Sequence, residues 1–171
     1  MRIRCRIIIL IAAIMLCVSA SQARAAQEVE VAFSPSTDAI KLLQYTINNA
    51  QQSIDVAAYS FTSYKVVDAL IDAQRRGVKV QVVLDKGQQN RRYHAISELQ
   101  TAGIPVRFNG NYAIMHNKFM IIDDKTIESG SFNYTTSAEK RNAENVIVIR
   151  DNKPLAAKFV KNWKKLWDEA G

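Results

Sequence analysis

The stretch MHNKFMIIDDKTIESGSFN, from Met115 to Asn133, decides how this 171-residue chain is interpreted. Its apolar centre, FMII, is typical of a buried strand, yet His116 and Lys118 stand at the start of the run. Residues two apart on a strand share a face, so these two side chains are expected to point the same way. Ser131 and Asn133 are again two apart. We expect all four polar side chains to converge where the strand ends meet.

The four side chains supply one imidazole, one cation and two neutral hydrogen-bonding groups, a combination that suits a phosphate. Lys, Ser and Asn can hold the equatorial oxygens of a phosphoryl group in transfer. An imidazole can attack phosphorus or give a proton to a leaving oxygen. A hydrolytic metal site needs several converging ligands, whereas the chain has two histidines, two cysteines and no HxxxH or DxD cluster. We therefore expect no metal ion and no other cofactor.

Residues 1–25 are typical of a secretory signal peptide that is cleaved before Ala26. Arginines precede an almost wholly apolar run over 7–18, and small residues occupy the two cleavage-determining positions. The alternative is a transmembrane anchor, but the apolar run is short for crossing a bilayer. We expect an exported protein, periplasmic or secreted, with no stable membrane anchor after cleavage.

Cleavage would change the composition of the mature protein. Both cysteines, Cys5 and Cys17, lie in the leader, so the remaining chain would fold without disulfides. Four arginines would also leave, which lowers Lys+Arg from 23 to 19 against 16 acidic residues and the net charge from +7 to about +3. This mild basicity permits an anionic partner without indicating one.

The apolar periodicity alternates between strand-like and helix-like segments over 26–171, which we interpret as one catalytic domain. Strands are expected at 29–33, 53–61, 78–84, 104–108, 113–122 and 144–150. Helices are expected at 40–50, 64–76, 88–101 and 154–168, and a loop over 124–141. This alternation predicts an α/β fold with a mixed, mostly parallel β-sheet flanked by helices on both faces.

The motif His-x-Lys-x(4)-Asp-x(6)-Gly-Ser-x-Asn, from His116 to Asn133, resembles the full HKD signature of the phospholipase D superfamily. Six fixed positions make this match far more specific than an isolated HxK. The AAYSFTS segment, Asp85 and Glu144 extend the resemblance to the small exported bacterial endonucleases of that superfamily. The resemblance covers nearly all of the chain after the leader and implies a phospholipase D-like fold.

The resemblance also implies a role for each site residue. His116 would be the nucleophile that forms a covalent phosphohistidine, or the acid that protonates the leaving group. Lys118 and Asn133 would bind the phosphate oxygens, with Ser131 in support. Glu144 would hydrogen-bond the imidazole and set its tautomer, as a carboxylate does in a triad.

The number of motifs predicts a partner. Larger members of the superfamily carry two HKD motifs, because one imidazole attacks while another acts as the acid. This chain has one motif, and its other histidine, His94, has no Lys two residues later. We expect a homodimer whose composite site takes His116 from each copy, with Glu144 facing the partner. Asp123 completes the catalytic set, although the motif Asp is largely structural in this family.

Three functions remain open from the sequence. The first is a metal-independent, sequence-nonspecific endonuclease that hydrolyses DNA, with RNA as a further substrate. The second is a phospholipase D that hydrolyses phosphatidyl head groups. The third is an inert nucleic-acid-binding accessory protein that retains the motif. Trp163 and Trp167 could stack on bases, but their spacing on an amphipathic helix favours the core.

Overall fold

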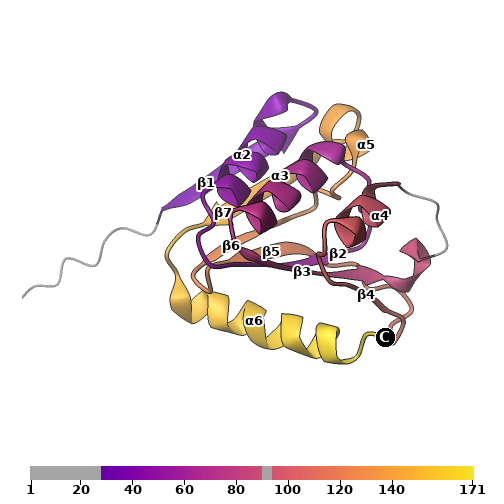
Figure 1. Cartoon of the computed structure of the whole chain (residues 1–171). Coiled ribbons are helices and arrows are strands. Elements are labelled where there is room, and N and C mark those ends of the chain that lie inside the picture. The colour runs from indigo at the N-terminus through magenta and orange to yellow at the C-terminus, as the bar shows by residue number, and fades with distance from the viewer. Residues whose placement is uncertain (1–27, 90–93) are drawn as a thin grey trace, which may run out of the picture.

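The computed structural model describes residues 28–89 and 94–171 (Figure 1). The expected signal peptide lies outside these residues. Among the helices of the described ranges, none combines the length and apolar character needed to cross a bilayer.

The described strands form one sheet with the order β1-β7-β6-β5-β2-β3-β4. Strands β2, β3 and β4 run parallel to one another, and every other neighbouring pair is antiparallel. The strands are β1 (Val29–Ser34), β2 (Ser53–Ala58), β3 (Lys79–Asp85), β4 (Val106–Asn109), β5 (Lys118–Ile122), β6 (Thr126–Gly130) and β7 (Glu144–Ile149).

The prediction of a mostly parallel sheet is therefore wrong, because the sheet is mixed but mostly antiparallel. The physical reason is β6, which lies within the stretch expected to be a loop. Asp123 and Asp124 have positive φ angles of 54° and 52°, and the N–H of Lys125 donates to the carbonyl of Ile122 at 3.1 Å. Two successive residues in this conformation form a tight hairpin turn, which makes β5 and β6 antiparallel.

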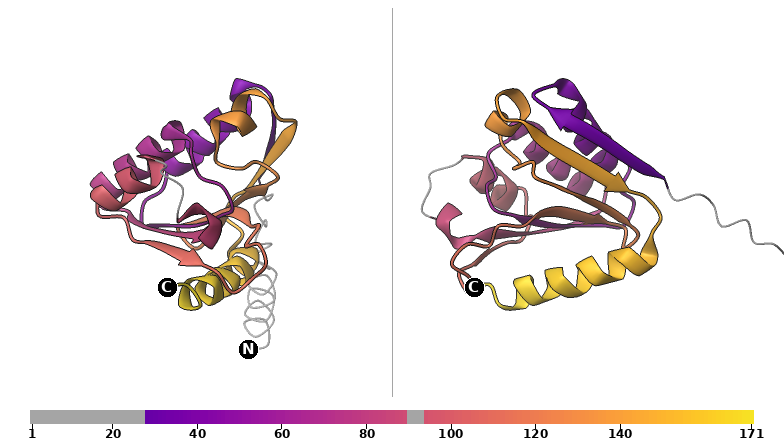
Figure 2. Two further views of the ribbon diagram at one scale, coloured as in Figure 1. Left: turned by 90° about the vertical axis from the view of Figure 1, so that its right-hand side faces the viewer. Right: turned by 180° about the vertical axis from the view of Figure 1, so that it is seen from behind.

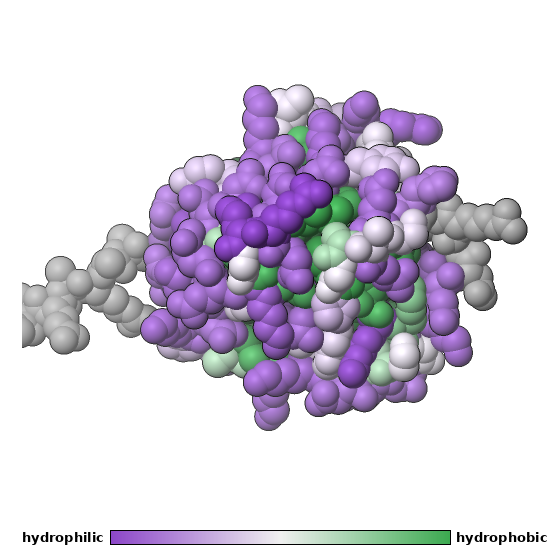
Figure 3. Space-filling model, viewed as in Figure 1, coloured by the Kyte–Doolittle hydropathy of each residue, from purple (hydrophilic) through white to green (hydrophobic). Residues whose placement is uncertain are grey.

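Helices cover both faces of the sheet, as the sequence predicts (Figures 1 and 2). One face carries α2 (Thr37–Asn48), α3 (Tyr64–Arg75), α4 (His94–Thr101) and the short α5 (Thr136–Lys140), and the other carries α6 (Lys153–Asp168). On β5, Met120 and Ile122 join the first core, whereas Phe119 and Ile121 join the core beneath α6. Hydrophilic side chains cover most of the face seen in Figure 3, where apolar surface shows chiefly near the middle.

Helix α6 is fixed across its face by polar contacts as well as by packing. The indole N–H of Trp163, which is 3% exposed, donates to the carbonyl of Val56 on β2 at 2.9 Å. Its ring stacks on Trp167 with centroids 4.9 Å apart. Side chains from the β4 region, Arg107 and Asn109, donate to carbonyls in the last turn of α6. Trp163 therefore belongs to the core, and the half-buried Trp167 packs against that core and against the guanidinium of Arg107, 4.4 Å from its ring centroid, which favours a packing role over stacking on bases.

The carboxylate of Asp85 links the short helical turn after β3 to the segment that leads into β5. The 3₁₀ turn η1 (Lys86–Gln88) follows β3, and Asp85 caps it by accepting from the N–H of Gly87 at 2.8 Å. The second carboxylate oxygen of Asp85 accepts from the N–H of Met115 at 2.8 Å. This contact ties the end of β3 to the segment that leads into β5.

Candidate active site

His116 lies just before β5, at the end of the sheet where β2 terminates beside the start of β5. The strand expected at 113–122 begins only at Lys118, so residues 113–117 enter it as an extended connection. The backbone is held on both sides of the histidine, because Met115 is bonded to Asp85 and the carbonyl of Asn117 accepts from the N–H of Tyr59 at 2.9 Å. His116 itself is exposed. The fold therefore presents an accessible imidazole on a fixed backbone.

Tyr59 brings the imidazole and the motif lysine together. Its ring centroid lies 4.5 Å from that of His116, and the Nζ of Lys118 lies 5.3 Å from the same tyrosine ring. Lys118 is 8% exposed and donates to the carbonyl of His116 at 2.9 Å. Burial lowers the pKa of the Lys118 ammonium, and the nearby Glu144 carboxylate opposes this shift. The expected convergence of His116 and Lys118 is thus present in the fold.

Ser131 and Asn133 come directly after the end of β6, the strand that pairs with β5. The side-chain oxygen position of Asn133 is buried and has no hydrogen-bond partner, which is uncommon for a buried polar atom. Since amide oxygen and nitrogen are distinguished by their partners, a rotated amide would offer N–H groups to an anion at this position. The hydroxyl of Ser131 accepts from the N–H of Asn145 at 3.0 Å, which holds the segment against β7.

Gly130 of the motif is required by the close approach of β6 to β7. A Cβ placed on Gly130 would lie 2.1 Å from the backbone carbonyl oxygen of Asn145. No side-chain rotation can relieve a collision with backbone, so only glycine fits here.

Replacing Gly130 with alanine is expected to force β6 from β7 and to lower the free energy of unfolding by about 3 kcal/mol. Activity should fall as well, because Ser131 and Asn133 are carried by the displaced segment. Urea denaturation and turnover would be measured together, with Ser129→Ala as the control on the preceding residue, since its hydroxyl makes one weak bond at 3.3 Å. An alanine variant as stable as the parent would show that the two strands can separate without cost.

Glu144 begins β7 close enough to Lys118 for its carboxylate to oppose the lowering of the lysine pKa that burial causes. Its carboxylate accepts from the amide of Asn142 at 3.1 Å. In the described part of the chain it makes no hydrogen bond to His116. The expected orienting contact is therefore not made within one copy, which leaves Glu144 half-exposed at the margin of the site.

The structure does not bring Asp123 to the other predicted site residues. Asp123 follows the last residue of β5, so the whole five-residue strand, roughly 15 Å long, lies between it and the segment that carries His116. Its carboxylate accepts backbone N–H groups of Gln51, Gln52 and Ser53 at 2.7–3.1 Å. This geometry gives Asp123 a structural part, holding the start of β2 to the β5–β6 turn, and does not support its place in the catalytic set.

A cavity of about 420 Å³ opens beside the imidazole. His116 and the first residues of β5, Lys118 and Phe119, line it together with Lys158 and Asn162 of α6. The sequence alone places Lys158 with Lys161, Lys164 and Lys165 on a cationic helix face and gives no signal for Asn162. The i, i+4 spacing of Lys158 and Asn162 places them on one side of the helix, and the packing of α6 against the sheet makes this side part of the cavity wall.

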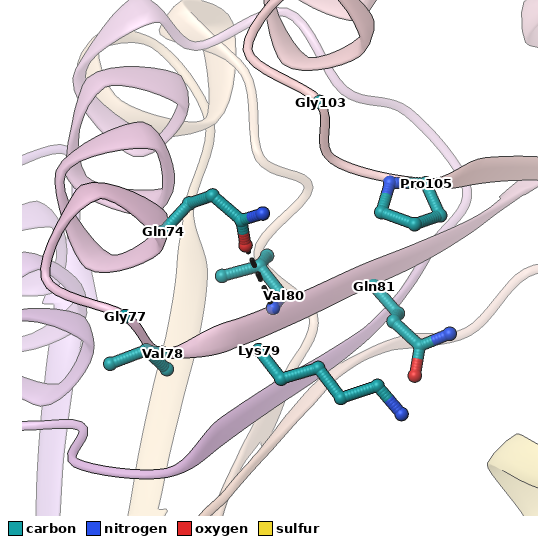
Figure 4. A pocket seen from close by; sticks show the side chains of 8 residues that line it. All are labelled: Gln74, Gly77, Val78, Lys79, Val80, Gln81, Gly103 and Pro105. Atoms are coloured by element: carbon teal, nitrogen blue, oxygen red, sulfur yellow. Dashed lines mark hydrogen bonds between the residues drawn. The ribbon is translucent and has the colours of Figure 1, made fainter.

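A second hollow, of about 280 Å³, lies at the opposite edge of the sheet, between the end of α3 and Pro105 (Figure 4). Gln74 closes part of it by accepting from the N–H of Val80 at 3.2 Å. Lys79 is the one titratable side chain in its wall. This hollow contains no nucleophile or proton donor suited to phosphate chemistry, so we place the site at His116.

A buried carboxyl and a buried phenol, those of Glu128 and Tyr134, form a hydrogen-bonded pair next to the segment that carries Asn133. Glu128 on β6 is 1% exposed and accepts the phenol O–H of Tyr134 at 2.6 Å, while its other oxygen has no partner. Burial raises the pKa of Glu128 to about 8 and raises that of Tyr134 well above its usual value. The carbonyl of Tyr134 also accepts the N–H groups of Thr62 and Ser63. The pair therefore fixes the segment that carries Asn133, and no sequence signal pointed to it.

Within residues 28–89 and 94–171, no group of three or more His, Cys, Asp or Glu side chains could hold a metal ion. Metal-independent chemistry stays a prediction.

Comparison with known proteins shows the family to which this chain belongs. The family model described as cardiolipin synthase, phospholipase D-like domain, matches residues 43–167. The chain is 43% identical to the phospholipase D of Rickettsia prowazekii over 135 residues, which cover 79% of this chain and 65% of that protein. It is 34% identical to the mitochondrial cardiolipin hydrolase of Chlamydomonas reinhardtii, covering 83% of this chain and 62% of that protein. The chain thus spans about two thirds of these relatives.

Two solved structures match over nearly their whole length. Nuc of Salmonella typhimurium, a phospholipase D family member, superposes with a TM-score of 0.81 and 37% identity, covering 85% of this chain and 97% of Nuc. NucT from Helicobacter pylori superposes with a TM-score of 0.75 and 27% identity, covering 84% and 98%. The family match, together with the HKD geometry, identifies this chain as a phosphodiesterase of the phospholipase D superfamily.

Proposed function

We propose that this phosphodiesterase is an endonuclease that hydrolyses DNA without sequence preference and without a metal ion, and that it also accepts RNA. The observation that carries the proposal is the exposed His116 imidazole beside Lys118 at the mouth of a cavity. The match to Nuc and NucT supports a nuclease, because it covers 97% and 98% of those chains. The relatives named for lipid substrates are matched over a smaller share of their length.

The proposed reaction begins when His116 attacks phosphorus and the bond from phosphorus to the leaving oxygen breaks. The leaving oxygen takes a proton from the partner's His116. That second imidazole then removes a proton from water, which attacks the phosphohistidine and releases the phosphorylated end and free His116. Lys118, Asn133 and Ser131 hold the equatorial oxygens while charge develops on them.

The second imidazole has to come from another copy of the chain. His94, the other histidine, is exposed at the start of α4, on the face of the sheet opposite α6. We therefore propose a homodimer with one composite site, in which Glu144 orients the imidazole of the partner. Its half-exposed carboxylate, unbonded to the histidine of its own copy, supports this arrangement. Export to the periplasm or medium is also proposed, from residues 1–25 alone.

A phospholipase D acting on phosphatidyl head groups is the second candidate. The names of the Rickettsia and Chlamydomonas relatives favour it, and the same attack on phosphorus would release a head group. An inert nucleic-acid-binding protein is set aside, because the chain belongs to a phosphodiesterase family and retains every motif position.

The substrate can be tested in one panel. We expect the purified protein, in excess EDTA, to nick plasmid DNA and to degrade single-stranded DNA and RNA, while phosphatidylcholine and cardiolipin vesicles stay intact. Products would be followed by gel electrophoresis and by head-group release. Release of head groups without any nicking of DNA would contradict the nuclease and support the phospholipase D. Activity that is lost in EDTA but restored by a divalent cation would contradict the metal-independent mechanism.

A further inference from the structure

The cavity at the active site lies on the α6 face of the sheet. Phe119 of β5 and Ser129 of β6 are paired directly, so their side chains share a face, and Phe119 belongs to the core beneath α6. Lys118, one residue earlier, alternates to the other face with Met120. The cavity therefore adjoins the place where Lys118 would hold the scissile phosphate, and offers additional space beside it.

The size of the cavity exceeds the need of one phosphate group. Its volume of about 420 Å³ falls within the range of sites for small organic ligands, roughly 300–1,000 Å³. A nucleic-acid strand that brings one phosphodiester to His116 continues beyond the cut on both sides. The next part of that strand has room in this cavity.

The wall of the cavity carries positive charge. Among the described residues that line it, none is Asp or Glu, whereas Lys118 and Lys158 are cations. Lys158 is exposed, and within residues 28–89 and 94–171 its ammonium makes no hydrogen bond or ion pair. Lys165, two turns further along α6, differs because it lies 3.8 Å from the carboxylate of Glu169. Lys158 is therefore available to an anion from outside the chain.

Helix α6 presents Lys158 and Asn162 together on a fixed support. The two residues are four apart in the helix, so their side chains are neighbours. Phe159, which follows Lys158, packs edge to face on Phe119 of β5 with ring centroids 5.1 Å apart, and this contact anchors the turn to the sheet. An ammonium and a side-chain amide both supply N–H donors, which the unesterified oxygens of a phosphodiester accept.

We propose that Lys158 and Asn162 form a second phosphate subsite, which binds the phosphodiester next to the one that His116 attacks. This inference rests on the proposed nuclease function, because a nucleic-acid strand carries its next phosphodiester one nucleotide away. The lysine supplies charge and the amide supplies a directed hydrogen bond, and neither takes part in bond cleavage. Efficient cleavage of a short strand therefore requires a charged phosphodiester beside the scissile one.

The test uses short strands that differ only in the charge of one linkage. The substrates are the thymidine trinucleotide TpTpT and its two analogues, in each of which one linkage is an uncharged methylphosphonate. We expect the parent protein to cleave TpTpT with a kcat/KM at least about tenfold higher than either analogue, because each analogue lacks one charge-assisted contact. Products would be separated by reversed-phase chromatography.

Lys158→Gln should lower kcat/KM on TpTpT at least about tenfold and remove most of the preference for TpTpT over its analogues. Asn162→Ala should act in the same direction with a smaller loss. Lys161→Gln is the matched control, since Lys161 is an exposed lysine of the same helix outside this cavity and its loss should leave the preference unchanged. Circular dichroism and thermal unfolding would show that each variant is folded.

Salt dependence supplies a second measurement on a longer single strand. Each contact between a lysine and a phosphate of a single strand contributes about 0.7 to the slope of log affinity against log salt concentration. Lys158→Gln should therefore flatten the fall of kcat/KM with salt by about that amount. A slope equal to that of the parent would mean that Lys158 contacts no phosphate.

The outcomes separate the subsite from the nuclease function. Equal kcat/KM values of the parent on TpTpT and both analogues would overturn the subsite and leave the nuclease in place. A Lys158→Gln variant that keeps the preference, or a Lys161→Gln variant that loses it equally, would also overturn the subsite. If the parent hydrolyses bis(p-nitrophenyl) phosphate but cleaves no strand of DNA or RNA, the nuclease function is contradicted and the subsite with it.

Discussion

Replacing His116 with alanine is expected to lower phosphodiester cleavage at least about a thousandfold, because the change removes both the nucleophile and the acid from the composite site. The free energy of unfolding should change little, since the ring is exposed and its main contact is with Tyr59. Turnover would be followed with a labelled single-stranded oligonucleotide in EDTA, beside urea denaturation of the same samples.

His94→Ala is the control for this variant. It removes the other imidazole of the chain from an exposed position at the start of α4. We expect its turnover to equal that of the parent. Equal losses of turnover in the two variants would show that the loss is not specific to His116 and would contradict the chemistry proposed. A His116→Ala variant with full turnover would show that His116 is not the nucleophile.

The second large effect is a loss of stability as the pH rises from 4.5 to about 8, and it comes from Glu128. Glu128 ionises near pH 4.5 in an unfolded chain, whereas burial raises its pKa to about 8 in the folded protein. The folded state must therefore keep a proton that the unfolded state loses, so stability is fully present below pH 4.5 and is lost as the pH rises to about 8. Since one pKa unit corresponds to about 1.4 kcal/mol, the loss from this group is roughly 5 kcal/mol.

Glu128→Gln isolates this contribution. The amide keeps an oxygen that can accept the phenol proton of Tyr134 but cannot ionise. Below pH 4.5 the variant and the parent should have similar free energies of unfolding, and by pH 8 the variant should be more stable by several kcal/mol. The variant has to be compared with the parent because burial also raises the pKa of Asp55, to about 6. Ionisation of Asp55 therefore lowers the stability of both proteins alike as the pH rises.

Urea denaturation at a series of pH values would measure the difference. Asp168→Asn, which changes an exposed carboxylate on α6, is expected to give a small difference that does not grow between pH 4.5 and 8. A constant difference between the Glu128→Gln variant and the parent across this range would show that the carboxyl is ionised, and solvated or paired, inside the fold.

Local patterns predicted the elements that bury one apolar face. Helix α3 was expected at 64–76 and occupies Tyr64–Arg75, and α6 was expected at 154–168 and occupies Lys153–Asp168. Strand β6 was missed because its centre is Glu128, a charged residue type that interrupts the apolar alternation. Its burial depends on Tyr134, which reaches it only through the fold.

The direction of the sheet depends on contacts that sequence periodicity does not encode. Alternating strands and helices suggested parallel crossovers throughout, yet after β4 the chain forms a hairpin, and β1 pairs antiparallel with β7 across more than a hundred residues. In the site, the HKD spacing predicts His116, Lys118, Ser131 and Asn133 as functional residues, and their roles stay predictions. The anchoring of Met115 by Asp85 and the place of Tyr59 between the imidazole and the lysine appeared only in three dimensions.

The composite site can be tested most directly on a heterodimer of one parent chain and one His116→Ala chain, co-expressed with two different affinity tags and purified through both. The measurement is its specific activity on DNA in EDTA relative to the doubly tagged parent dimer. If both imidazoles serve one site, the heterodimer should retain about one hundredth of the activity or less. Retention of about one half would mean that each copy works alone, and would contradict the account.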